Sequence, residues 1–180
     1  MTVFTDELRR QAEGIMARYP ERRSALLPLL YLVQAEQGHV TREGMKEVGE
    51  LLGLTTAEVE AVATYYTMFK KVPTGDWLLS VCTNLSCGLA GGRLLYERAR
   101  EASAEDQGIE VEEVECLGAC DAAPVVQVNY CSFDRVDESR IVEIVEALRG
   151  GKPPPPSRGP TPVPHRDTAR FLAGLRGPGA

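Results

Sequence analysis

The sequence has 180 residues, 43% of them hydrophobic and 26% charged, which is typical of a globular protein with one domain or two small ones. Its formal net charge of −6 argues against nucleic acid as a partner, because binding to phosphates requires a basic face. No apolar run approaches the roughly 20 residues that span a bilayer, and the acidic start of the chain is unlike a signal or transit peptide. We therefore expect a cytosolic protein without direct membrane insertion.

The segment 1–72 contains no cysteine and predicts four short amphipathic helices. Side chains that can cap helix starts and glycines that can end helices recur along this segment: Thr5 or Asp6, Ser24, Gly38, Thr41, Gly53 and Thr55. Pro28 is expected in the first turn of the second helix, where its missing N–H has no helical partner. Thr55 and Glu58 have the spacing of a capping box. Short connections between such helices predict a small antiparallel bundle.

The segment 73–150 alternates predicted strands and helices. Extended or alternating apolar runs predict strands at 77–81, 110–116, 125–130 and 132–136, and helical periodicity marks 93–102 and 139–148. The last two strands are expected to form a hairpin. The order strand, helix, strand, strand, strand, helix predicts a small α/β sandwich of the thioredoxin-like kind. The chain as a whole is therefore expected to be an α+β protein.

The segment 151–180 differs in composition from the rest of the chain. It holds eight of the twelve prolines, including the run 153–156, and five basic residues against Asp167 alone. Such a proline run favours extended polyproline II structure. Asp167 is expected to cap a short helix whose apolar side is Phe171, Leu172 and Leu175, and a helix this short needs a surface to lie on. We interpret the segment as a basic docking tail.

Four of the five cysteines form two close pairs. Cys82 and Cys87 are separated by four residues, and Cys116 and Cys120 by three, with 28 residues between the pairs. Each pair follows a predicted strand, so two loops at one end of a sheet would bring four sulfurs together. Thiols stay reduced in the cytosol, and four thiolates suit soft metals and iron–sulfur clusters.

The spacing favours one cofactor over its alternatives. Structural zinc sites prefer Cys-x-x-Cys, and so does thiol–disulfide exchange, whereas these loops are longer and fit a [2Fe–2S] cluster with two thiolates on each iron. Gly88 and Gly118 would let backbone N–H groups approach the sulfurs, or they would simply make turns. A zinc-stapled interaction module and a thioredoxin-like disulfide reductase remain open at this point.

Three motifs resemble the family of 24-kDa subunits of respiratory complex I, the NADH:quinone oxidoreductase. They are Thr-Tyr-Tyr-Thr-Met-Phe at 64–69, Val-Cys-Thr-Asn-Leu-Ser-Cys at 81–87 and Cys-Leu-Gly-Ala-Cys-Asp-Ala-Ala-Pro-Val at 116–125. The resemblance covers about residues 1–150 and implies one [2Fe–2S] cluster held by Cys82, Cys87, Cys116 and Cys120. The tail lies outside it. Related subunits of NAD-linked hydrogenases and formate dehydrogenases share these motifs.

The resemblance also implies the partners of the chain. It places the chain beside a flavoprotein subunit that carries FMN and oxidises NADH, together with further iron–sulfur subunits, on the cytoplasmic side of the bacterial inner membrane. The run 88–92 lacks the dinucleotide fingerprint, so FMN and NADH are expected only on the partner. The chain then has no catalytic residues of its own and transfers single electrons.

The remaining chemically notable residues receive weaker interpretations. Cys131 has no partner at ligand spacing and is interpreted as an unligated thiol. His39 and His165 are assigned no role, and Trp77 is expected in the core. The aromatic residues of the 64–69 motif are interpreted as packing between the domains. Four acids beside the second cysteine pair, Glu112, Glu113, Glu115 and Asp121, predict a low reduction potential, because reduction adds negative charge to an anionic cluster.

Overall fold

The computed structural model describes residues 2–175 and divides the chain into two compact units. One unit, here called the helical unit, combines 1–73 with 165–180, and the other, the thioredoxin-like unit, spans Thr74–Pro164. This division differs from the expected boundaries at 72 and 150, because the proline-rich segment is shared between the two units. Arg176, one of the basic residues of the expected tail, lies outside the described residues.

The helical unit contains the four predicted helices and one from the end of the chain. These are α1 (Asp6–Met16), α2 (Leu26–Gln37), α3 (Arg42–Leu52), α4 (Thr56–Tyr65) and α8 (His165–Leu172). Thr5 and Thr41 cap α1 and α3, and Thr55 and Glu58 form the expected capping box of α4. The prediction for Ser24 is wrong. A 3₁₀ turn at Arg22–Ala25 precedes α2, and Ala25 occupies the cap position.

Helix α2 is the centre of this unit. Its residues are buried on several sides, with Leu29, Leu30, Leu32 and Val33 fully inaccessible. Gln34 is also fully buried, and its amide donates to the Met68 carbonyl (3.2 Å) and accepts from the Lys70 N–H (2.7 Å). The amide nitrogen and the amide oxygen of Gln34 on α2 therefore both bind the segment that follows α4.

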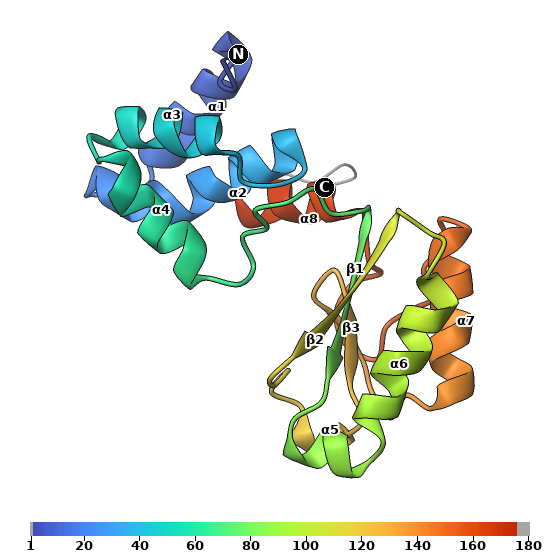
Figure 1. Ribbon diagram of the computed structural model, residues 1–180. Helices are drawn as coiled ribbons and strands as arrows, with labels where there is room; N and C mark the ends of the chain where they lie inside the picture. The colour runs from blue at the N-terminus through green and yellow to red at the C-terminus, as the bar shows by residue number, and fades with distance from the viewer. Residues whose placement is uncertain (1, 176–180) are drawn as a thin grey trace. The chain divides into compact units, whose positions relative to one another are not determined.

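Helix α8 packs against α2 (Figure 1). Its buried positions are His165, Ala169 and, just beyond the helix, Ala173, which share a face at a spacing of four residues. The expected apolar side was therefore wrong for Phe171 and Leu172, which are 67% and 39% exposed, whereas Leu175 packs partly buried against the core. The alanines at 169 and 173 are buried on this face together with the larger His165, whereas Phe171 points away from it. The short helix has the surface that it needs, and its own chain provides it.

The aromatic motif at 64–69 has one buried and one exposed end. Phe69 is fully buried in the core of the helical unit and meets Tyr31 edge to face, with ring centroids 5.0 Å apart. Tyr65, in contrast, is 79% exposed. The role of Phe69 is thus packing within the helical unit.

The thioredoxin-like unit has a four-stranded sheet in the order β2-β1-β3-β4. Its strands are β1 (Trp77–Cys82), β2 (Ile109–Val114), β3 (Val126–Val128) and β4 (Cys131–Phe133). Strands β1 and β2 are parallel, and β3 pairs antiparallel with both β1 and β4. The predicted hairpin is confirmed as β3–β4. Every residue of β1 is buried, including Trp77.

Two long helices pack side by side against this sheet, α6 (Gly92–Ser103) and α7 (Glu138–Arg149) (Figure 1). The parallel pairing of β1 and β2 requires a crossover, and α6 supplies it. Leu95, Ala99, Ile141 and Ile144 join the sheet residues in one core. A short helix, α5 (Leu85–Leu89), lies between β1 and α6 and was not predicted.

The extended segment 151–164 stays with the thioredoxin-like unit. The N–H groups of Ser157 and Arg158 donate to the Ser132 carbonyl (2.8 and 3.3 Å), and the Arg158 guanidinium pairs with Asp134 (2.6 Å). At the start of β1, buried Asn129 donates to the carbonyls of Asp76 (2.9 Å) and Val163 (2.7 Å). The Asn129 side chain thus binds both the segment that enters the thioredoxin-like unit, at Asp76, and the segment that leaves it, at Val163.

Candidate iron–sulfur site

The two cysteine loops leave the sheet at the same end, where β1 and β2 finish. Cys82 is the last residue of β1 and pairs with Val114, the last residue of β2. Because β1 and β2 are parallel, their carboxyl ends lie together, and Cys116 follows two residues after β2 ends. The Cys82 thiol lies 3.7 Å from the Glu115 carbonyl, within this second loop.

Helix α5 carries the second cysteine of the first pair. Asn84 caps it by accepting from the Leu85 N–H (2.6 Å), and one turn later Cys87 is buried. Gly88 and Gly92 permit close backbone approach here. A Cβ on Gly88 would lie 2.8 Å from the Thr83 carbonyl oxygen, and one on Gly92 would lie 2.5 Å from that of Cys82. Tight packing of α5 and α6 on the Cys82 loop therefore requires glycine at both positions.

The second cysteine loop is more open. Cys116 and Cys120 are both exposed, and their Sγ atoms lie 3.9 Å apart. Gly118 between them has φ +71°, a left-handed conformation that favours glycine, and its N–H points at the Cys116 Sγ from 3.3 Å. A 3₁₀ turn at Cys120–Ala122 ends the loop. Gly118 therefore has both features considered for it from the sequence: it makes a turn, and its N–H approaches a cysteine sulfur.

The thiols of the two loops influence one another. The pKa of the Cys87 thiol is raised to about 11, mainly by burial and also by the nearby thiols of Cys82 and Cys120, while a hydrogen bond with the Val125 backbone opposes the rise. A hydrogen bond with Cys116 and that thiol's charge raise the pKa of Cys120, and Cys82 adds to the effect. Thiols from both loops therefore lie within electrostatic reach of one another, and a bound cation would offset the cost of ionising them together.

The donor set fits a [2Fe–2S] cluster. All four thiols are free, one pair is buried and the other exposed, and such a cluster takes four cysteine thiolates, two on each iron. Ala119, Ala122 and Val125 form a small apolar core with Cys82 and Cys87, which keeps water from the buried pair. Among residues 2–175, no three His, Cys, Asp or Glu side chains meet as a site for a single metal ion.

The other candidate residues lie apart from this group. Cys131 begins β4 and pairs with Val128, towards the opposite end of β1, and burial raises its pKa. His165 is buried in the helical unit. Sequence reasoning missed α5 and the role of Gly92; the cap at Asn84, two residues after Cys82, is the signal that could have revealed the helix.

Comparison with known proteins decides between the cofactors left open by the spacing. The profile of the family described as thioredoxin-like [2Fe–2S] ferredoxin matches residues 12–149. The chain belongs to the thioredoxin-like [2Fe–2S] ferredoxin family. This ferredoxin carries one [2Fe–2S] cluster rather than a structural zinc ion or a catalytic disulfide.

Two curated relatives place this ferredoxin more narrowly. A subunit of the NADH-quinone oxidoreductase of Mycobacterium tuberculosis is 44% identical over 171 residues, which cover 91% of this chain and 68% of the relative. A subunit of the NADH-quinone oxidoreductase of Thermus thermophilus is 38% identical over 159 residues, covering 83% of this chain and 88% of the relative. This ferredoxin is therefore an electron-transfer subunit of the NADH-quinone oxidoreductase class.

A solved structure shares the fold of this ferredoxin. An NAD⁺-reducing [NiFe]-hydrogenase in the H₂-reduced state superposes with a TM-score of 0.58 at 22% identity, covering 68% of this chain and 22% of the hydrogenase chain. The match spans about a fifth of that hydrogenase chain. No helix among the described residues of the ferredoxin has both the length and the apolar character to cross a membrane.

Proposed function

We propose that Cys82, Cys87, Cys116 and Cys120 hold the single [2Fe–2S] cluster. The observation that supports this proposal is the parallel pairing of β1 with β2, which brings both cysteine loops to the same end of the sheet. The fifth cysteine, Cys131, lies in the β3–β4 hairpin and is not a ligand in this proposal.

The residues around the four thiols have defined tasks. When bound, the cluster stores and releases one electron at a time. The Gly118 N–H donates towards the Cys116 sulfur and stabilises negative charge there. Val125 supplies a backbone hydrogen bond to Cys87, and the apolar residues around the buried pair exclude water. No side chain of this chain is required for bond-making chemistry.

The partner in this proposal is a flavoprotein subunit. It binds NADH and FMN, and this ferredoxin exchanges single electrons with that FMN in a complex on the cytoplasmic side of the bacterial inner membrane. The support is the similarity to subunits of NADH-quinone oxidoreductases. The corresponding position in an NAD-linked hydrogenase or formate dehydrogenase is the alternative, and the subunits that co-purify with the native chain distinguish the two.

Single substitutions test the ligand assignment. Each of the four cysteines is replaced with alanine in turn, and each variant should lose the red-brown colour and the axial EPR signal of the reduced protein, because one iron loses a thiolate. Cys131→Ser is the matched control and should retain the full iron content. Loss of the cluster in Cys131→Ser, together with its retention in one of the four alanine variants, would show that the assignment is wrong.

A further inference from the structure

Strand β2 lies at the edge of the four-stranded sheet and, within residues 2–175, pairs with β1 alone (Figure 1). The Gly108 carbonyl accepts from the Trp77 N–H (2.9 Å), so the residues of β2 with even numbers direct their backbone groups towards β1. Successive residues of a strand direct these groups to opposite sides, so Val111 and Glu113 direct theirs outward.

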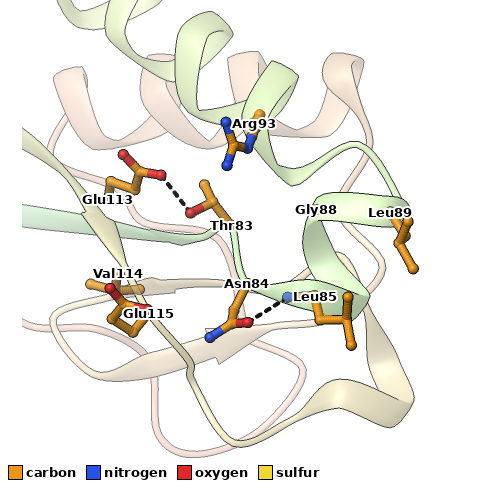
Figure 2. A pocket seen from close by; sticks show the side chains of 9 residues that line it. All are labelled: Thr83, Asn84, Leu85, Gly88, Leu89, Arg93, Glu113, Val114 and Glu115. Atoms are coloured by element: carbon orange, nitrogen blue, oxygen red, sulfur yellow. Dashed lines mark hydrogen bonds between the residues drawn. The ribbon is translucent and has the colours of Figure 1, made fainter.

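The outward backbone groups are satisfied where β2 begins but remain open in its middle. The Ile109 N–H donates to the Asp106 carbonyl in the preceding turn (3.3 Å). At the other end of the strand, the Glu113 carboxylate accepts from the Thr83 hydroxyl, which follows β1 (2.6 Å; Figure 2). This bond holds the Glu113 side chain towards the β1 side, so it does not cover the outer edge. The backbone of Val111 and Glu113 is therefore open to pairing with a further strand.

A hollow of about 540 Å³ lies beside this edge, between β2 and one side of α6. It is lined by Glu97, Arg100, Glu101, Ser103, Ala104 and Val111. Val111 packs partly buried against the core under α6. A strand added to β2 would lie about 4.8 Å from it and would direct alternate side chains to the α6 side. One of these side chains would enter the hollow next to Val111.

The charges around this edge select the kind of strand that fits it. The exposed or half-buried acids are Glu97, Glu101, Glu110, Glu112 and Glu113. Arg100 is the single base of the hollow, and it lies over the Tyr96 ring of its own helix, 5.7 Å from the ring centroid. Pairing of β2 with β2 of a second copy would place glutamates against glutamates, which destabilises a sheet. A strand with basic side chains has the complementary charge.

We propose that the outer side of β2 and the hollow next to it, here called the β2 edge, bind an extended basic segment of another subunit of the complex, which adds to the sheet as a fifth strand. The proposal rests on the proposed function, because the segment belongs to a subunit of the same complex. Backbone hydrogen bonds to Val111 and Glu113 supply affinity, and the hollow and the glutamates supply specificity. A fifth strand also holds β2 in place, and Cys116 follows two residues after β2 ends.

The first test compares hydrogen exchange in the isolated, cluster-loaded chain with exchange in the native complex. In the isolated chain, the amides of Val111 and Glu113 should exchange faster than those of Glu110 and Glu112, which face β1. In the complex, exchange at Val111 should slow by about tenfold or more, because its N–H donates to the added strand. Unchanged exchange at Val111 overturns the proposal. Protection in the isolated chain that rises with protein concentration overturns it in favour of a second copy.

The second test removes the outward donor. Val111→Pro lacks this N–H but keeps every hydrogen bond to β1, since proline is tolerated in an edge strand where the N–H faces away from the sheet. When this variant is expressed together with tagged wild-type chain, the complex should incorporate about tenfold less of the variant. Val111→Thr is the matched control, because it keeps the N–H and the branched side chain, and it should be incorporated like the wild type. Iron content and Trp77 fluorescence show whether each variant is folded.

A charge reversal decides if Val111→Pro does not fold. Glu97→Lys changes an exposed residue of α6 and should be incorporated about threefold less than the wild type. Glu146→Lys, on α7, makes the same change of charge at an exposed position away from the β2 edge and should have no effect. Wild-type incorporation of folded Val111→Pro, or equal incorporation of Glu97→Lys and Glu146→Lys, overturns the proposal. Absence of the wild-type chain from an NADH-oxidising complex would instead refute the proposed function.

Discussion

Replacing Asn129 with alanine should strongly destabilise the thioredoxin-like unit. The side chain is 2% exposed, accepts from the Leu78 N–H (2.8 Å) and donates to the carbonyls of Asp76 and Val163. Leaving the buried Leu78 N–H unsatisfied costs about 1–3 kcal/mol, and each of the two partly exposed carbonyls about 0.5–1.5 kcal/mol. The backbone at Asn129 has φ +45°, which costs alanine roughly 1 kcal/mol more than asparagine. We expect a total loss of about 3–7 kcal/mol.

Trp77 makes this loss measurable in one unit alone. It is the single tryptophan of the chain and the first residue of β1, next to Leu78, so its fluorescence in a urea titration reports unfolding of the thioredoxin-like unit. Asn129→Asp is the matched variant, because it keeps the acceptor for the Leu78 N–H and replaces the donor group with an oxygen.

The aspartate variant adds a dependence on pH. Two carbonyl oxygens beside the introduced carboxylate favour its protonated form, so its folded-state pKa is raised. The variant should therefore keep more of its stability at low pH and lose stability as the pH rises through that raised pKa. A loss below about 1 kcal/mol in Asn129→Ala, or an Asn129→Asp variant as stable as the wild type at pH 7, would refute the reasoning.

Three further predictions concern the site and the helical unit. Glu113→Gln and Glu115→Gln should each raise the reduction potential by tens of millivolts in a redox titration, because a carboxylate near the cluster opposes the added electron, and no rise in either variant would remove this electrostatic account. In the cluster-free protein, the pKa of Cys87 is raised from 9.0 to about 11. The free energy of unfolding should therefore be highest below pH 9.0 and should fall as the pH rises from there through about 11. Cys87 should also be the slowest thiol to be alkylated at about pH 8. Ala169→Glu should destabilise the helical unit by about 2–4 kcal/mol in thermal unfolding followed by circular dichroism, since Ala169 is 1% exposed against α2, whereas a Phe171→Glu control should change stability little.

The elements with strong local signals were predictable from the sequence. Capping residues and helix-ending glycines are local, so α1, α3 and α4 begin where Thr5, Thr41 and Thr55 indicate. The two cysteine loops were predictable for a similar reason, because each cysteine pair follows a run of strand-forming residues.

Other features depend on contacts between distant residues and left no local pattern. Helix α5 is only five residues long and is fixed by the close approach of Gly88 and Gly92 to carbonyls of the Cys82 loop. The buried face of α8 consists of His165 and two alanines, so hydrophobicity alone pointed to Phe171 and Leu172, on the wrong side. The end of the chain also showed no sign that it completes the helical unit rather than forming a separate tail.

This discontinuity of the helical unit affects the order in which a nascent chain can fold. Residues 74–164 leave the ribosome before α8 does, so the thioredoxin-like unit is complete while α2 still lacks one of its neighbours. At roughly 5–20 residues per second, the interval between α2 and α8 is on the order of ten seconds. The cysteine loops can therefore receive iron and sulfide while the apolar surface of α2 is open to chaperones. A chain whose synthesis stops before α8 keeps that surface of α2 exposed.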